Sequence, residues 1–160
     1  MYQSGVELRP VQDGDIEYIA ANVREADRIE IYESSRRDVA EALRDTVTRS
    51  ERTAVAVYDG KPEAIFGVGR LSLMSDVGVP WMIGTKALTG NARKVMSVAR
   101  PLLRRVMQGN EVLRNFVHAD NKLAIRWLKS MGFRFSEPIP YGWRGAKFHV
   151  FELNKEELDV

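Results

Sequence analysis

The sequence contains no cysteine and only two histidines, His118 and His149. Without cysteine there is no disulfide scaffold, no thiolate nucleophile and no zinc or iron–sulfur site with cysteine ligands. Two histidines are too few for a histidine-rich metal site, so we expect no bound metal. Serines are present, but none lies in a Gly-x-Ser-x-Gly elbow, and no Gly-x-x-x-x-Gly-Lys-Ser/Thr loop occurs. The sequence therefore has no signature of a serine hydrolase or of a P-loop nucleotide site.

Long apolar runs are also absent, which argues against a membrane-spanning helix and a membrane partner. The first eight residues carry no basic patch followed by an apolar stretch, so we expect no signal peptide and a cytoplasmic location. The chain has 160 residues, of which 44% are hydrophobic and 29% charged. This is the balance of one globular domain, and we expect residues 1–160 to form a single domain.

Charge is distributed unevenly along the chain, although the formal net charge is only +2. Residues 1–63 hold 9 Lys/Arg and 14 Asp/Glu, whereas residues 86–134 hold 11 Lys/Arg and only two acidic residues, Glu111 and Asp120. A basic segment of this kind can attract a phosphorylated cofactor, a nucleic acid or an acidic protein. The alternative interpretation is a solvated helix face without a partner.

The spacing of apolar residues predicts elements in the order β-α-α-β-β-β-α-β-α-β-β, which indicates an α/β domain. The predicted strands are an edge strand at 6–10 and strands at 53–58, 64–73, 77–85, 113–118, 133–135 and 148–153. Asp59-Gly60 predicts a hairpin turn, and 138–145 a turn-rich loop. The predicted helices run from Asp15 toward Tyr32, over 39–47 with Ser35 as cap, from Gly90 to Gly109 with a kink or restart at Pro101, and from a cap at Asp120 or Asn121 to Gly132.

The last of these helices carries a more specific pattern. Its Asn121, Ala124 and closing Gly132-Phe133 resemble, in type and spacing, the fourth helix of the GCN5-related N-acetyltransferase (GNAT) superfamily. The order of the predicted elements is also similar to that family. The resemblance implies a GNAT-like acyl-CoA N-acyltransferase fold, with a mixed, mostly antiparallel central sheet that is splayed at its centre and flanked by about four helices. It further implies acetyl-CoA or CoA as cofactor and an amine as acyl acceptor.

A second resemblance covers about half of the chain, from Trp81 to Phe135. It rests on Trp81–Thr85, Leu88–Lys94, Asn115–Val117 and the helix from Asn121. These residues are similar to a phage-encoded GNAT-like family that includes an internal virion (core) protein of short-tailed phages. The resemblance implies a phage or prophage origin, with the host cytoplasm or the virion as location and phage structural proteins as partners. It does not by itself imply catalysis.

The GNAT resemblance implies a cofactor-binding loop between Thr85 and Arg93. In such a site the pyrophosphate rests on backbone N–H groups at a helix N-terminus, where small residues allow close approach. Gly90-Asn91-Ala92 supplies the Gly-x-Ala half of the family pattern Gln/Arg-x-x-Gly-x-Gly/Ala, whereas Ala87 stands at its first position. The alternative is an ordinary loop-to-helix cap. The candidate cofactor-binding residues are Ile83, Thr85, Lys86, Gly90, Asn91, Ala92, Arg93, Lys94 and Asn121.

Two of these candidates, Arg93 and Lys94, are cations at a place where the helix dipole favours anions. Arg93 and Lys94 lie in the first turn of the predicted helix, where cations oppose the helix dipole unless an anion is bound there. Asn121 has the place of a family residue that orders the cofactor or a water molecule. Its alternative role is a simple N-cap.

The catalytic positions match the family less well. The family's frequent general acid, a tyrosine four residues before the closing glycine, is replaced by Leu128. Tyr141, in the late loop, is the residue that could substitute for it. A base is also needed, because an amine nucleophile must lose its proton. His118 ends a strand beside the implied cofactor cleft, and Glu33, with Glu30 nearby, lies near the end of the first predicted helix.

The candidate catalytic residues are therefore His118, Glu33 and Tyr141, with a structural role as the alternative for His118. Three functions fit the sequence. The first is a CoA-dependent N-acyltransferase; the second is a GNAT-like phage protein that has lost catalysis and acts in virion assembly or DNA ejection; the third is a regulator that binds nucleic acid or protein through its basic face. The sequence identifies neither the acceptor amine nor the oligomeric state.

Overall fold

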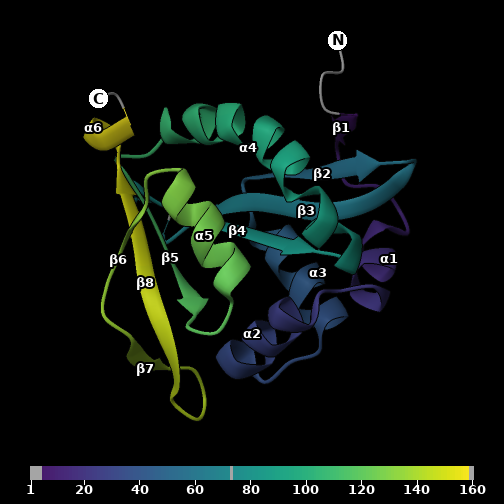
Figure 1. Ribbon diagram of the computed structural model, residues 1–160. Coiled ribbons are helices and arrows are strands. Elements are labelled where there is room, and N and C mark those ends of the chain that lie inside the picture. The colour runs from purple at the N-terminus through teal and green to yellow at the C-terminus, as the bar shows by residue number, and fades with distance from the viewer. Residues whose placement is uncertain (1–4, 73, 159–160) are drawn as a thin grey trace.

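A single mixed sheet forms the centre of the protein. The computed structural model describes residues 5–72 and 74–158, and within these ranges eight strands pair in the order β1-β2-β3-β4-β5-β8-β6, with β7 added to β8 (Figure 1). Of the strand pairs in these ranges, only β4 and β5 are parallel. The mixed, mostly antiparallel sheet confirms the expected fold class. The strands are β1 Val6–Arg9, β2 Arg52–Tyr58, β3 Lys61–Arg70, β4 Val77–Gly84, β5 Val112–His118, β6 Arg134–Phe135, β7 Ile139–Tyr141 and β8 Ala146–Asn154.

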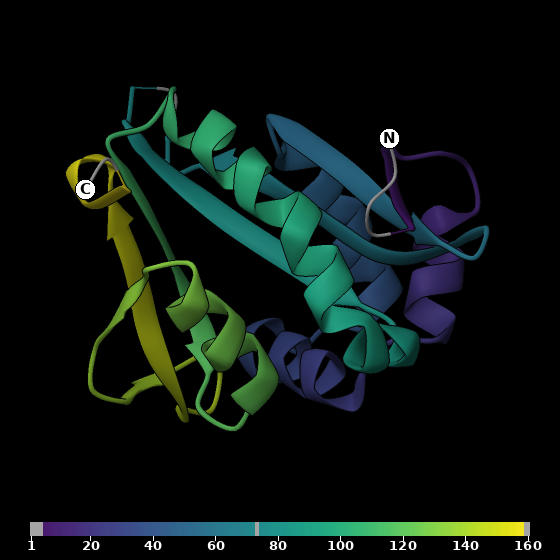
Figure 2. The same cartoon turned by 45° about the horizontal axis from the view of Figure 1, so that its top comes forward.

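Helices cover both faces of the sheet (Figures 1 and 2). The first face carries α1 Asp15–Ala21, α2 Glu25–Ser35 and α3 Val39–Arg49, and the second carries α4 Ala92–Met107 and α5 Lys122–Ser130. A 3-10 helix, η1 Lys86–Asn91, leads from β4 into α4, and a short helix, α6 Lys155–Leu158, follows β8. No helix in the described part of the chain is both long and apolar enough to cross a membrane.

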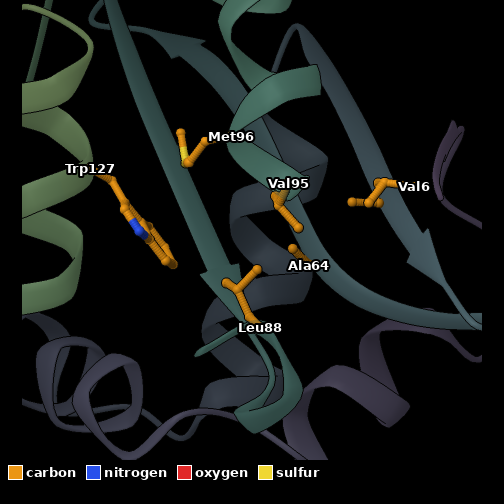
Figure 3. Packing of buried hydrophobic residues seen from close by; sticks show 7 residues of the cluster. Val6, Ala64, Leu88, Val95, Met96 and Trp127 are labelled. Atoms are coloured by element: carbon orange, nitrogen blue, oxygen red, sulfur yellow. The ribbon is translucent and has the colours of Figure 1, made fainter. Parts of the chain in front are cut away.

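The hydrophobic core is divided by the sheet, because successive strand residues point to opposite faces. Ala64 packs with Val95, Met96 and Trp127 on the side of α4 and α5 (Figure 3). Its neighbour Ile65 packs on the opposite side, against the helices of the N-terminal region. The alternating apolar side chains of the strands therefore supply a packing surface for the helices on each face of the sheet.

The first predicted helix is in fact two helices. The chain leaves the helical path at Asn22–Arg24, because this segment pairs with the end of β4. Val23 forms a bridge with Thr85, and the N–H of Arg24 donates to the Gly84 carbonyl at 2.9 Å. The prediction of a single helix from Asp15 to Tyr32 was therefore wrong. The reason is a tertiary contact that the local sequence does not encode.

Three other local predictions need correction. Asp38, not Ser35, caps α3, because its carboxylate accepts the Glu41 N–H at 2.8 Å. The helix containing Pro101 runs from Ala92 to Met107 without a restart, while a kink at Pro101, the other predicted possibility, stays a prediction. The segment 138–145 contains a strand, β7, as well as turns. The hairpin at Asp59-Gly60 is confirmed, since both residues have positive φ, at 51° and 74°.

The sheet is splayed at its centre. β4 and β5 pair only where they begin, with Val77 opposite Val112 and Gly78 opposite Leu113. β5 then continues in full pairing with β8, while β4 continues with β3. The two central strands therefore diverge toward their carboxyl ends. This splay positions the candidate site.

Candidate functional site

A cavity of about 330 Å³ lies where β4 and β5 diverge. Its walls are mostly apolar and come from both strands and from the helices α4 and α5. Polar side chains reach it at the wide end, from the start of α2. Residues that line it include Met82, Met96, Ala99, Phe116, Trp127 and Leu128.

Asn115 closes the narrow end of the splay. Its side-chain Nδ2 donates to the Pro80 carbonyl on β4 at 2.8 Å. Its Oδ1 accepts the Phe116 N–H at 2.7 Å. The side-chain amide thus replaces the first pair of backbone hydrogen bonds that the diverging strands lose. The partly buried Pro80 carbonyl and Phe116 N–H would otherwise have no partner in the sheet.

Met82 lies farther along the same edge of β4. In a strand, the N–H and C=O of residues two apart point to the same side. The Pro80 carbonyl and the Gly84 N–H both point into the splay, where Asn115 and Asp27 bind them. The N–H and C=O of Met82, between them, therefore also face the cavity. They form a short stretch of strand edge that an extended ligand with an amide group can pair with.

A buried polar cluster closes the wide end. Asp27 accepts hydrogen bonds from the Gly84 N–H at 2.9 Å, from Arg24 at 3.1 Å and from Asn121 at 3.2 Å. Arg24 also donates to the Asn121 side chain at 3.2 Å. Asp27, Arg24 and Asn121 are all nearly inaccessible to solvent. Burial raises the pKa of Asp27, and the Arg24 guanidinium opposes that shift.

Glu30 is the least constrained member of this cluster. Its Oε1 accepts the His118 N–H at 2.8 Å and the Asn121 amide at 3.2 Å, while no hydrogen bond to its Oε2 is made within the described ranges. Burial, reinforced by the charge of Asp27, raises the pKa of Glu30 to about 7. Glu30 is one of the residues that line the cavity, so a side chain with this pKa is placed where it can exchange a proton with a bound molecule at neutral pH.

The predicted base Glu33 has a different environment. It lies one turn beyond Glu30 and forms a bidentate ion pair with Arg144, whose Nε is 2.8 Å from Glu33 Oε1. This hydrogen bonding holds the pKa of Glu33 below its usual range. Glu33 joins α2 to the β7–β8 hairpin and does not line the cavity.

The other two predicted catalytic residues meet at one ring. The His118 ring and the Tyr141 ring each make an edge contact with Phe148, with centroids 5.1 and 5.2 Å away. His118 Nδ1 accepts the Asp120 N–H at 3.1 Å. Tyr141 stacks on Phe116, a residue that lines the cavity, with centroids 3.8 Å apart. The structure thus brings both residues to the carboxyl end of β5, although, like Glu33, neither is among the residues that line the cavity.

The first half of the predicted cofactor loop is occupied by internal contacts. The N–H groups of Thr85 and Lys86 donate to the carbonyls of Glu63 and Asn22. The Thr85 hydroxyl donates to the buried Glu63 carboxylate at 3.2 Å. Ile83 is buried and lines the cavity. An anion at this loop must therefore bind farther along the chain, near the start of α4.

The second half of the loop is open. A Cβ added to Gly90 would meet no heavy atom within 4 Å, and the side chains of Arg93 and Lys94 are exposed. Asn91 has the N-cap position of α4, but its Nδ2 donates to the Ala87 carbonyl and its side chain does not cap the helix. Ala92 begins α4. Lys94 Nζ donates to the Tyr58 hydroxyl at 3.0 Å.

Asn121 stands apart from this loop. It has the N-cap position of α5, but its side chain makes no capping hydrogen bond and is used entirely in the buried cluster with Arg24, Asp27 and Glu30. The sequence does contain a signal for this cluster. Arg24, Asp27 and Glu30 recur every third residue, so that one face of a helix is polar where a buried face should be apolar.

The described part of the chain contains no group of three or more Asp, Glu or His side chains that could hold a metal ion.

Comparison with known proteins identifies the fold. No family model and no curated protein sequence matches the chain. Solved structures do match. A ribosomal-protein-alanine N-acetyltransferase from Brucella melitensis is 14% identical, with 92% of this chain and 99% of that chain covered and a TM-score of 0.72. The putative acetyltransferase yncA of Salmonella typhimurium, solved with its cofactor acetyl-CoA, is 16% identical, with 94% of each chain covered and a TM-score of 0.68. A spermidine N-acetyltransferase from Vibrio cholerae, in complex with CoA and spermine, is 14% identical, with 99% of this chain and 100% of that chain covered and a TM-score of 0.66. The fold is that of the GNAT acetyltransferases.

Proposed function

We propose that the protein is a CoA-dependent N-acyltransferase that moves an acetyl group from acetyl-CoA to an amine. The observation that carries this proposal is the splay, where the unpaired edge of β4 at Met82 and the ionisable residue Glu30 line the same cavity. Solved neighbours with this fold are complexes with acetyl-CoA or CoA. The resemblance of the helix from Asn121 to the GNAT superfamily points to the same activity.

The residues in the splay fit the cofactor. Its pantetheine arm is extended and contains amide groups, which match the N–H and C=O of Met82 and the apolar cavity walls. Its pyrophosphate matches the exposed cations Lys86, Arg93 and Lys94, at the positive end of the α4 dipole. The open space beside Gly90 leaves room for it. The cofactor, when bound, supplies the thioester as an activated acyl group.

Glu30 is the proposed base. An ammonium acceptor must lose its proton before it attacks, and Glu30 Oε2 is free to receive that proton from the cavity side. The His118 N–H and the Asn121 amide hold the other oxygen in place. With a pKa of about 7, Glu30 is partly ionised at neutral pH.

Leu128 occupies the family position of the acid and lines the cavity. Its side chain is aliphatic and has no proton to donate to the leaving sulfur. We assign that proton to the Tyr141 hydroxyl, because Tyr141 stacks on the cavity residue Phe116. The rings of His118 and Tyr141 both contact the ring of Phe148, and through this contact His118 helps to position Tyr141. Glu33 fixes the hairpin that carries Tyr141 through its ion pair with Arg144.

A second function is favoured by Leu128 and by the resemblance of residues 81–135 to phage-encoded proteins. The chain would then be a phage or prophage protein that keeps the fold and acts in virion assembly or DNA ejection without acyl transfer. Calorimetry with acetyl-CoA, followed by detection of released thiol with a panel of polyamines, peptides and small amines, separates the two functions. Binding with amine-dependent thiol release is expected. Absence of binding at millimolar acetyl-CoA would overturn the acyltransferase proposal.

A further inference from the structure

The outward surface of α4 and α5 carries charge of one sign. The two helices contain no Asp or Glu, and all of their Lys and Arg side chains are exposed. Both helices pack on the same face of the sheet (Figures 1 and 2). We call this surface the basic face. Its residues are Arg93, Lys94, Arg100, Arg104 and Arg105 on α4 and Lys122, Arg126 and Lys129 on α5.

The cations of the basic face have no carboxylate partners. None of the ion pairs formed within residues 5–72 and 74–158 includes one of them. The helices on the opposite face differ in this respect, since there Arg28 pairs with Glu25 and Arg44 with Glu17. The positive potential of the basic face is therefore not neutralised locally, although the whole chain carries only +2.

The proposed cofactor explains only one end of this surface. Arg100 follows Arg93 by seven residues, and Arg104 follows Arg100 by four. Seven and four residues are close to two and one turns of an α-helix, so the three arginines form one stripe along α4. At 1.5 Å per residue the stripe is about 16 Å long. A pyrophosphate at the start of α4 can reach Arg93 and Lys94. Arg100 and Arg104 lie about 10–16 Å farther along the axis and need another anion.

A lipid surface does not fit the basic face well. Interfacial helices combine cations with exposed apolar anchors. In the described ranges the exposed large apolar side chains are elsewhere in the fold. Single-stranded nucleic acid would need exposed aromatic rings on which to stack its bases, and the aromatic residue of α5, Trp127, is buried in the core. Large apolar side chains with substantial exposure are Ile29, Tyr32, Leu71, Met74, Ile139 and Trp143.

We propose that the basic face binds the phosphate backbone of duplex DNA without reading its sequence. The rows of cations on two adjacent helices match a polymer whose charge is regularly spaced, and neutralising its phosphates releases condensed counterions. The interaction does not depend on acetyl transfer. The proposed enzyme activity and this binding can therefore fail independently.

The test is fluorescence anisotropy with a labelled duplex between 50 and 200 mM NaCl. The wild-type protein should bind with an affinity that falls steeply with salt. Arg100→Ala combined with Arg104→Ala should lower the affinity at 50 mM salt about tenfold or more and reduce the log–log salt slope by about 2. Arg44→Ala combined with Arg49→Ala, on α3, removes the same charge from the opposite face and should change neither quantity.

Three outcomes would overturn the proposal: equal losses in the two double variants, binding that does not depend on salt, or tighter binding to vesicles rich in phosphatidylserine than to the duplex. Thermal unfolding of both double variants shows that each is folded. The four arginines are exposed, so we expect both melting curves to match that of the wild type.

Discussion

Asp27 and Glu30 lie one helical turn apart on α2 and bind the ends of two different strands. Asp27 accepts the N–H of Gly84 at the end of β4, and Glu30 accepts the N–H of His118 at the end of β5. The two carboxylates thus satisfy backbone groups that the splay deprives of strand partners. Through α2 they link the diverging ends of β4 and β5, and both residues line the cavity between them.

Replacing Glu30 by Gln should reduce acyl transfer while leaving the fold intact. The amide can still accept the His118 N–H, but it cannot take a proton from the acceptor amine. We expect kcat/KM to fall by about 100-fold or more. The wild-type rate should rise with pH through about 7, and the variant should lose this step. Glu25→Gln, on the exposed side of the same helix, is the matched control, and an equal loss there would contradict the assignment.

The same substitution should change the pH dependence of stability. The pKa of Glu30 is raised from 4.5 to about 7 on folding, so the folded state holds its proton more tightly than the unfolded state. This contribution is fully present below about pH 4.5 and is lost as the pH rises to about 7. Relative to wild type, Glu30→Gln should therefore gain stability across this window, by at most about 3 kcal/mol. Urea unfolding at several pH values measures it; a constant difference would contradict the shifted pKa.

Replacing Gly90 by Glu should weaken acetyl-CoA binding. The position has room for a side chain, so the fold should tolerate it, but the new carboxylate would lie against the pyrophosphate. We expect the affinity in calorimetry to fall by about tenfold or more. Gly109→Glu is the matched control, because that glycine is equally open and lies at the other end of α4. Unchanged affinity in Gly90→Glu would mean that the cofactor phosphates bind elsewhere.

Two glycines of the β7–β8 hairpin provide a test of its contact with α2. Gly142 and Gly145 both have positive φ, at 84° and 72°. A Cβ at Gly142 would lie 2.0 Å from the Glu33 carbonyl oxygen, whereas at Gly145 its nearest neighbour is a Pro140 carbon at 3.7 Å. Gly145→Ala should cost about 1–2 kcal/mol for the backbone alone. Gly142→Ala should cost about 1–3 kcal/mol more in chemical unfolding, because the hairpin must move off α2. Equal costs would show that this contact is not tight in solution.

Much of the fold could be predicted from the sequence, because local patterns determine it. The alternation of apolar residues located the strands from β2 to β5, and Asp59-Gly60 located their first hairpin. The single apolar stripe of α4 located that helix, although Pro101 made us expect a kink or restart. In each case the residues that form the element also contain its signal.

The residues of the candidate site were harder to predict from the sequence than the helices and strands. Glu30 and Glu33 are both acidic residues on one helix, and nothing local distinguishes the one that faces the cavity from the one that pairs with Arg144. Asn121 has the sequence of an N-cap, yet its amide binds carboxylates that are more than 90 residues earlier in the chain. The roles of the predicted cofactor loop, His118 and Tyr141 remain predictions.

The sequence by itself determined the period of each element, the turns, the charge on α4 and α5 and hence the class of the fold. Tertiary structure alone decided where the first helix breaks and which of the two carboxylates, Glu30 or Glu33, lies at the cavity. The reason is that both depend on the divergence of β4 and β5, which leaves unpaired backbone N–H groups at Gly84 and His118. Such groups must find partners when they are buried, and the partners came from a helix some 50 to 90 residues earlier in the chain.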